Sequence, residues 1–246
     1  MDPHEYELMF AAEDRHWWYR GMECLIRAIL DHRYGRDGRL RILDAGCGTG
    51  RAMTSYLASY GRVTGVDVSE IALGYCRRRN AGDLVRANVT GLPFPSGSFD
   101  LVASFDVLYE RDVANDAQAV EEFARLIVPG GRLLLRLPAY DWLRGQHDCP
   151  IHTARRYTAG QVARLIERCG LTVELLSYAN TFLFPFALLK RMQERIRPIS
   201  APKSDLETDF GLLDGVLRSI LCLEAPFITH AGLPFGLSVL AVGRKI

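Results

Sequence analysis

The sequence predicts an α/β protein built on a doubly wound, mostly parallel sheet. Apolar, strand-like runs alternate with helix-like stretches, which is the pattern of a parallel sheet covered by helices on both faces. A glycine-rich turn over 43–50 lies where the first run passes into a helix-like stretch. The chain of 246 residues, 48% of them hydrophobic, is long enough for one such domain with a lid. The strand-like runs cover residues 40–44, 62–67, 83–87, 99–105 and 132–137.

The remaining elements follow from periodicity and capping signals. Residues 5–33 read as one or two amphipathic helices. Thr158 is expected to cap a later helix, because Gln161 stands at the capping-box position three residues on. The expected elements after the fifth strand are a loop over 138–157, a helix over 158–169, a strand over 171–178 and a final strand or strand pair over 233–245.

A long connection, residues 180–232, separates the last two expected strands. It contains two helix-like pieces, 186–197 and 209–224, and connections of this length are often functional. The strand before it is expected to be parallel, so it ends at the sheet edge where ligands of open α/β sheets bind. We therefore expect this insertion to form a lid. The chain then reads as one domain with an N-terminal helical lid (1–36), a Rossmann-like core (37–179), a helical insertion (180–232) and a final strand (233–246).

The composition of the chain limits which partners and which cellular compartment we expect. The chain has 30 Lys and Arg against 29 Asp and Glu, so no overall positive field favours RNA or DNA as a substrate. The six cysteines form no C-x-x-C pair, which favours reduced thiols. The first seven residues are acidic, unlike a signal peptide, and no apolar run approaches the roughly 20 residues that span a bilayer. We expect a cytoplasmic protein that binds no nucleic acid.

The glycine-rich turn carries most of the functional signal. It reads L-D-A-G-C-G-T-G, and its glycines are Gly46, Gly48 and Gly50. Arg51 stands where a dinucleotide-binding turn has its third glycine. Asp44 would repel a pyrophosphate, but it suits a ligand with an ammonium group and a positively charged sulfur. The turn therefore favours S-adenosylmethionine over NAD.

Residues 40–137 resemble the class I S-adenosylmethionine-dependent methyltransferases. Beyond the turn, the match includes Asp67 and the stretch from Val85 to Val102, which is similar to the family's D-x-x-x-L-P-F-x-x-x-S-F-D-x-V. The resemblance implies a seven-stranded sheet whose last strand is antiparallel. It also implies S-adenosylmethionine as the methyl donor and S-adenosylhomocysteine as the product. With nucleic acid not expected, we expect direct displacement by an oxygen, nitrogen or carbon nucleophile of a small molecule, such as a natural-product intermediate, a sugar or a lipid-like compound.

Two alternatives stay open. A NAD-linked oxidoreductase would share the strand-turn-helix layout. A non-catalytic S-adenosylmethionine-binding module would keep the turn and Asp67, but the insertion would block its pocket. Tyr109 and Glu110 stand where many relatives have a Glu-His pair, and the loss of that histidine keeps the second alternative open.

The resemblance also implies roles for individual residues around the cofactor. Asp67 would accept hydrogen bonds from both ribose hydroxyls. Asn88 takes the place of the family's adenine-reading acid, and Val89 would offer its backbone N–H to the adenine ring. Asp106 is expected beside the cofactor without acting in catalysis. The expected contacts in the core are Asp44, Gly46, Cys47, Gly48, Gly50, Asp67, Val68, Asn88, Val89, Phe105 and Asp106.

The N-terminal run His16-Trp17-Trp18-Tyr19-Arg20 is rich in aromatic residues for a surface helix. Similar H-W-W openings occur in bacterial methyltransferases of this class. Arg20 could pair with the cofactor carboxylate while Trp17 shields the sulfonium and Trp18 faces the acceptor, because aromatic faces attract cations. Packing in a core or lid is the alternative for these indoles.

Methyl transfer needs alignment of the acceptor and, for some acceptors, a base. His147 and His152 lie in the loop expected over the pocket, and histidine titrates near neutral pH. Either could be the base, or both could be loop residues bound to backbone groups. Tyr109 and Glu110 are further candidates near the methyl group. No spacing matches a metal site, so no metal is expected.

Arg155, Arg156 and Tyr157 directly precede the helix that Thr158 caps. Two arginines at a helix start oppose the helix dipole, which suggests that they bind an anionic group of the acceptor. Salt bridges to a nearby acid, such as Asp141 or Asp148, are the alternative.

The insertion begins with an apolar segment, 181–189, and then turns basic over 190–197. Such a segment can pack as a lid or as a homodimer contact, and we favour these interpretations over contact with a membrane surface.

Overall fold

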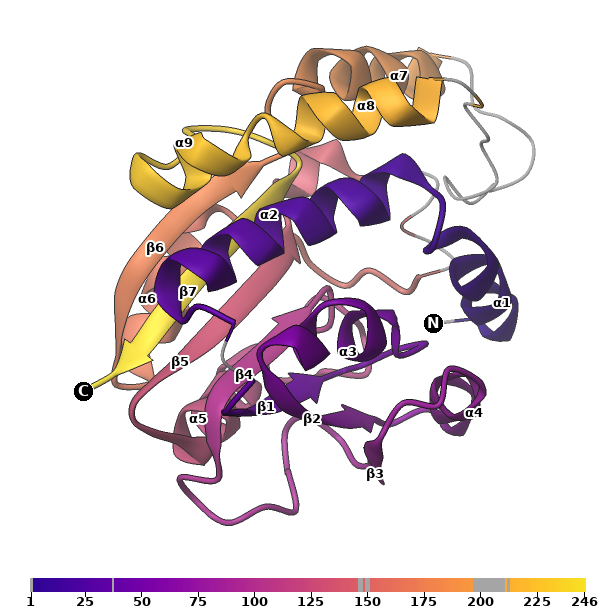
Figure 1. The fold of residues 1–246 in the computed structure, drawn as a ribbon. Helices are drawn as coiled ribbons and strands as arrows, with labels where there is room; N and C mark the ends of the chain where they lie inside the picture. The colour runs from indigo at the N-terminus through magenta and orange to yellow at the C-terminus, as the bar shows by residue number, and fades with distance from the viewer. Residues whose placement is uncertain (1, 37, 146–147, 149–150, 197–210, 212) are drawn as a thin grey trace.

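The computed structural model describes residues 2–36, 38–145, 148, 151–196, 211 and 213–246. In these residues, seven strands form one sheet in the order β3-β2-β1-β4-β5-β7-β6 (Figure 1). Strand β7 is antiparallel to both of its neighbours, and the other strands are parallel. The predicted fold class, with its antiparallel last strand, is confirmed. The strands are β1 (Leu40–Ala45), β2 (Gly61–Asp67), β3 (Asp83–Arg86), β4 (Phe99–Phe105), β5 (Ile127–Pro138), β6 (Leu171–Ala179) and β7 (Ser238–Lys245).

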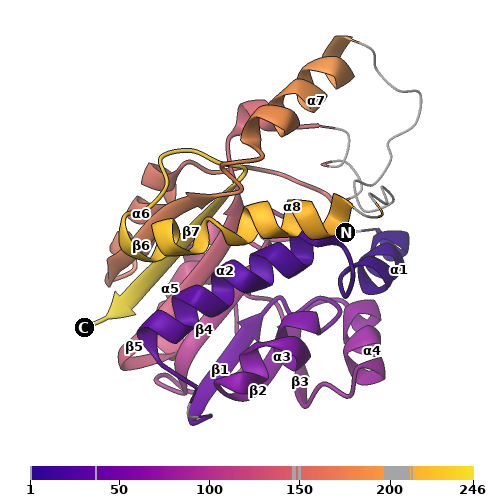
Figure 2. The same cartoon turned by 45° about the horizontal axis from the view of Figure 1, so that its top comes forward.

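Helices cover both faces of this sheet, as the alternation in the sequence predicts (Figures 1 and 2). Successive strand residues point to opposite faces, so Ile42 packs on the side of α2 and α3 whereas Leu43 packs on the side of α5. The helices are α1 (Pro3–Ala12), α2 (Trp17–Arg33), α3 (Arg51–Ser55), α4 (Glu70–Arg78), α5 (Asp116–Leu126), α6 (Ala159–Arg168), α7 (Phe184–Ile196), α8 (Leu213–Cys222) and α9 (Ala225–His230). No helix in the described ranges is long and apolar enough to cross a bilayer.

The insertion between β6 and β7 forms α7, α8 and α9, in place of the two helices expected. Pro226 near the start of α9 has no N–H to continue α8, which explains the break. The last strand is also shorter than predicted, because it begins at Ser238. Pro234 cannot donate to a ladder, and Gly236 passes so close to β6 that an added Cβ would lie 2.3 Å from the Ala179 carbonyl oxygen.

Glu224 anchors the insertion where it leaves the sheet. Its fully buried carboxylate accepts hydrogen bonds from the backbone N–H groups of Asn180 (2.7 Å), Thr181 (2.6 Å) and Phe182 (2.8 Å). These bonds satisfy donors that would otherwise be buried without partners. The chain therefore leaves β6 along a fixed path into α7.

The N-terminal helix α1 is fastened over the glycine-rich turn. Glu13 accepts a short hydrogen bond from the Thr49 hydroxyl and pairs with Arg79, which directly follows α4, at 2.8 Å. Phe10 packs against Tyr75 with ring centroids 4.8 Å apart. The α1 residue Met9 covers Gly48, since a Cβ on that glycine would lie 3.2 Å from the Met9 methyl carbon. This helix thus covers one side of the cavity described next.

Candidate functional site

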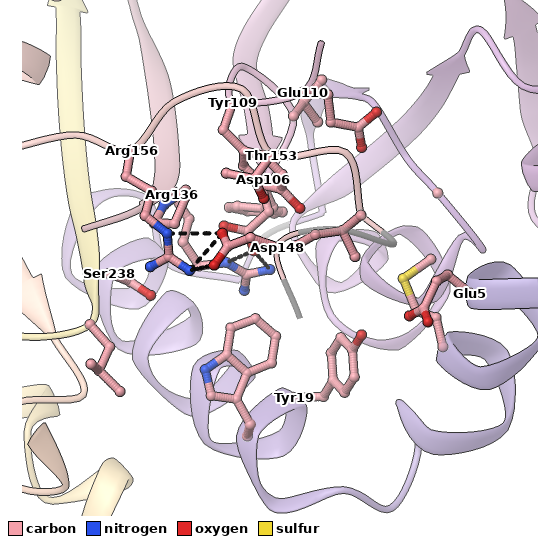
Figure 3. Close-up of a pocket in the computed structure, with 18 of the residues that line it drawn as sticks. Glu5, Tyr19, Asp106, Tyr109, Glu110, Arg136, Asp148, Thr153, Arg156 and Ser238 are labelled. Carbon is pink, nitrogen blue, oxygen red and sulfur yellow. Dashed lines mark hydrogen bonds and ion pairs between the residues drawn. The ribbon is translucent and has the colours of Figure 1, made fainter. Parts of the chain in front are cut away.

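A cavity of about 990 Å³ lies above the carboxyl ends of the central strands (Figure 3). This is the edge at which ligands of open α/β sheets bind, and the volume is at the upper end of the range for ligand pockets. The floor comes from the ends of β1, β2, β4 and β5, and the walls come from α1, α2, α7 and α8. Predicted residues that line it are Gly46, Gly48, Asp67, Val68, Asn88, Val89, Phe105, Asp106, Tyr109, Glu110, Trp17, Trp18 and Arg156.

The glycine-rich turn leaves β1 with three residues in the left-handed region. The φ angles of Gly46, Gly48 and Gly50 are 83°, 54° and 81°. A Cβ on Gly46 would come within 2.2 Å of the Val107 side chain, so this glycine is needed for packing. Gly48 is open towards the cavity, apart from Met9 above it. The turn therefore presents bare backbone to a ligand.

Asp67 is positioned at the end of β2 before any ligand binds. Its carboxylate accepts hydrogen bonds from the backbone N–H groups of Gly48 (3.0 Å) and Ser69 (2.8 Å). Burial raises the pKa of Asp67, while these two bonds lower it. Both oxygens are thus fixed in place at the cavity wall, where a two-oxygen acceptor suits a ribose.

Asp44 lies at the end of β1, is 1% exposed and does not line the cavity itself. Within the described residues, its Oδ2 atom has no hydrogen-bond partner. Burial, and then the charge of Asp67, raise the pKa of Asp44 to about 7. A buried carboxyl group with an unpaired oxygen is stabilised in its ionised form by a cationic ligand nearby. This fits the sulfonium and ammonium groups of S-adenosylmethionine.

Arg136, at the end of β5, is a cavity residue that our sequence analysis missed. Its guanidinium pairs with Asp106 at 2.7 Å and lies between the rings of Trp18 and Phe105, 4.9 and 5.2 Å from their centroids. Burial lowers the pKa of Arg136, but the charge and hydrogen bond of Asp106, together with Tyr56 and Tyr19, raise it above its usual value. An arginine inside the apolar run 133–137 was the available signal.

A second ion pair, between Arg156 and Asp148, borders the same space (Figure 3). The guanidinium makes a two-pronged contact with the carboxylate, at 3.0 Å from Nε and 2.9 Å from Nη2. This is the salt-bridge alternative left open for Arg156. Arg155 does not line the cavity and pairs with Asp116 at 3.3 Å. The Tyr157 hydroxyl is bound to Asp116 and to the Leu108 carbonyl, so this side chain belongs to the core.

Tyr109 and Glu110 both line the cavity, as expected from their position after β4. Burial, reinforced by the charges of Asp67 and Asp112, raises the pKa of Glu110 to about 7. Burial also raises the pKa of Tyr109 well above its usual value, so the phenol stays protonated at neutral pH. Of these two groups, Glu110 is the one that can exchange a proton near neutrality.

Several predicted residues lie elsewhere. The imidazole of His152 contacts Asp2 at 2.9 Å, and only its neighbours Ile151 and Thr153 line the cavity. His147 lies outside the described residues. Arg20 is exposed and borders a separate surface groove with Glu23 and Arg27, so the structure does not bring it to the cofactor turn.

Three further cofactor candidates have structural contacts of their own. Cys47 is buried with its sulfur 3.7 Å from that of Cys76, and Gly50 packs against the same cysteine. Neither lines the cavity, so both support the turn from behind. The Asn88 side-chain oxygen accepts hydrogen bonds from the backbone N–H and the hydroxyl of Thr90, each at 3.0 Å. An adenine amino group would have to share this oxygen.

Comparisons with known proteins agree with this geometry. Residues 43–135 match a family model described as a methyltransferase domain. A Mycolicibacterium smegmatis protein named as an S-adenosylmethionine-dependent methyltransferase is 30% identical over 165 residues, which cover 65% of this chain and 62% of the relative. A fatty-acid O-methyltransferase from the same organism is 36% identical over 143 residues, covering 52% of this chain and 50% of the relative. The chain thus spans less than two thirds of the length of these curated relatives.

A solved structure shows the same fold over nearly the whole chain. It comes from the complex of the Haloferax volcanii Trm112 methyltransferase activator with a methyltransferase, and it matches with a TM-score of 0.62 at 22% identity. The match covers 99% of this chain and 93% of that chain. The predicted family, with S-adenosylmethionine as its cofactor, is confirmed. Residues 43–135 belong to the class I S-adenosylmethionine-dependent methyltransferases.

Proposed function

We propose that this protein transfers a methyl group from S-adenosylmethionine to a small-molecule acceptor, leaving S-adenosylhomocysteine. The observation that carries the proposal is one cavity that joins the glycine-rich turn and Asp67 to a roofed space under α7 and α8. A ligand at the turn and a second ligand under the roof would share this space. The open cavity also favours activity over a binding module blocked by its insertion.

Different residues of the cavity would bind different parts of S-adenosylmethionine. Asp67 would hold the ribose, Asn88 and Val89 would contact the adenine, and Asp44 would favour the positive charges of the methionine end. Arg136 would take the role expected of Arg20, because it lines the cavity, its charge acts on Asp44, and its guanidinium can pair with a carboxylate. Trp17 and Trp18 line the cavity and would exclude water from the sulfonium.

When bound, S-adenosylmethionine supplies a methyl group on a sulfonium, which is already activated for displacement. The protein then has to hold the acceptor in line and, for a hydroxyl or amine acceptor, remove a proton. Glu110 is our candidate for that base, because its pKa of about 7 suits proton transfer at neutral pH. His152 is a weaker candidate for this base, because it lies on the surface beside Asp2.

Transfer of labelled methyl groups tests the proposal. The purified chain would be incubated with methyl-labelled S-adenosylmethionine and a cell extract separated into small-molecule, organic-soluble, protein and nucleic-acid fractions. We expect label in the small-molecule or organic-soluble fraction, and less of it with Asp67→Ala. Label confined to protein or nucleic acid would contradict the proposed acceptor class.

A further inference from the structure

The roof of the cavity presents apolar side chains close to the sheet, and two cationic ones, Lys190 and Arg191, further along α7. On α7 and just before it, Leu183, Phe186 and Ala187 line the cavity at helical spacing. On α8, Leu217 and Ile220 do the same. None of these five side chains can form a hydrogen bond, so this part of the wall favours contact with hydrocarbon. Lys190 and Arg191, one turn further along α7, add cationic groups to the same cavity.

The polar groups at this end of the cavity lie on its floor. Arg136 with Asp106, and Arg156 with Asp148, form two adjacent ion pairs at the base of the roofed space (Figure 3). The cavity is therefore lined by polar groups from the ends of the strands and the adjoining loops, and by the five apolar residues named above from the roof. A ligand that fills this space is therefore expected to have one polar part and one apolar part.

The roofed space reaches the surface at apolar residues of the two helices. Helices α7 and α8 diverge from each other away from the sheet (Figure 2). Phe186 and Leu213 both line the cavity, yet they are 70% and 58% exposed. An apolar opening lets a chain longer than the cavity extend outwards without burying a polar end.

Resting on the proposed function, we infer that the acceptor carries a long apolar chain, of the fatty-acyl or prenyl type. The chain lies between α7 and α8, with its end at the opening beside Phe186. The polar head lies on the floor, near the two ion pairs and the methyl group. The apolar part of the wall thus favours lipid-like acceptors over sugars.

The test is a calorimetric titration of the full chain, with S-adenosylhomocysteine present, with carboxylates and alcohols of 6 to 12 carbons. Burial of each added methylene is expected to tighten binding by up to about fourfold, until the chain emerges at the opening. The same affinity at every chain length would overturn the inference.

Two variants on one helix locate the chain. Leu217→Gln places an amide in the apolar wall and is expected to weaken binding of the 12-carbon ligands at least tenfold. Val216→Gln is the matched control, because Val216 is 54% exposed and does not line the cavity. Equal loss in both variants, or loss in Val216→Gln together with a change of oligomeric state on size-exclusion chromatography, would place the chain at a different surface. In that case the inference fails.

Titration of each variant with S-adenosylmethionine alone separates the two proposals. Chain-length dependence without any binding of S-adenosylmethionine would contradict the proposed function and leave the apolar site standing. Binding of S-adenosylmethionine without chain-length dependence would contradict the inference alone. Ala187→Leu offers a second check, because it narrows the space without adding a polar group and should favour shorter chains.

Discussion

Asp67 shows how a single residue can be prepared for its ligand. The N–H groups of Gly48 and Ser69 fix both carboxylate oxygens before a ribose binds. Asp67→Ala should remove two hydrogen bonds to a charged acceptor, each worth about 1.5–3 kcal/mol. We expect calorimetry to show S-adenosylmethionine binding at least tenfold more weakly.

Asp83→Ala is the control for this change. Asp83 is a half-exposed carboxylate on the neighbouring strand, and it pairs with Arg62 at 2.7 Å on the surface. Its removal should leave the affinity for S-adenosylmethionine unchanged. If Asp67→Ala binds as tightly as Asp83→Ala, the ribose is not held where the structure suggests.

Glu110 leads to a prediction about pH. Because burial raises its pKa to about 7, the ionised form that can accept a proton becomes populated as the pH rises through 7. With a hydroxyl or amine acceptor, kcat should rise about tenfold per unit below pH 7 and level off above it. Glu110→Gln should lower kcat by 10²- to 10⁴-fold and remove this rise.

Glu70→Gln serves as the comparison, since Glu70 lies on the surface of α4 and pairs with Arg77 at 2.7 Å. It should keep the pH profile of the parent protein. A parent profile that is flat between pH 6 and 8, or a Glu110→Gln variant with full activity, would remove Glu110 from the reaction.

The sequence alone could not show which arginine lines the cavity. Arg20 stands two residues after a tryptophan pair, which made it a candidate for the cofactor carboxylate, but it lies on the exposed side of α2. Arg136 interrupts an apolar strand, and burial of such a residue requires a partner, which Asp106 provides from the neighbouring strand. The pairing depends on the strand order β4-β5, which a single sequence does not reveal. By contrast, Asp67 was predictable because the end of a parallel strand fixes its place.

At the scale of elements, the contact between α2 and α8 holds the roof on the core. Gly21 of α2 faces Leu221 of α8, and a Cβ on this glycine would lie 2.5 Å from the leucine side chain. Gly21→Ala should therefore destabilise the protein by about 1–3 kcal/mol through overpacking, as measured by denaturant unfolding.

For Gly74→Ala we expect the opposite effect on the stability of the protein. Gly74 lies within α4, and no atom stands within 4 Å of an added Cβ. The usual preference of a helix for alanine should make this variant about 0.5–1 kcal/mol more stable. Stabilisation of similar size in Gly21→Ala would show that α8 does not pack closely on α2.

The sequence predicted an element correctly where one strong local feature determines that element. Thr158 and Gln161 form the expected capping box at the start of α6. The predicted start of β7 at residue 233 was wrong. The prediction gave more weight to the apolar residues after 232 than to Pro234 and Gly236, which interrupt the hydrogen-bond ladder. The place of the insertion was predictable from its length, but the direction of α7 and α8 depends on contacts with α2 and on Glu224.

At the scale of the whole molecule, the cavity joins segments that lie far apart in the chain. Tyr6, Asp67, Arg136, Leu217 and Ser238 all border it. The family signature covers only the floor, so the cofactor site was predictable and the roof was not. The homodimer expected through residues 180–232, and a cytoplasmic location, remain predictions.

The most direct test of the account is a calorimetric titration of the purified chain with S-adenosylmethionine and, separately, with NADH. We predict micromolar binding of S-adenosylmethionine, weakened at least tenfold by Asp67→Ala, and no binding of NADH. Binding of NADH alone would contradict the assignment of the turn from Asp44 to Gly50, and the proposed function with it.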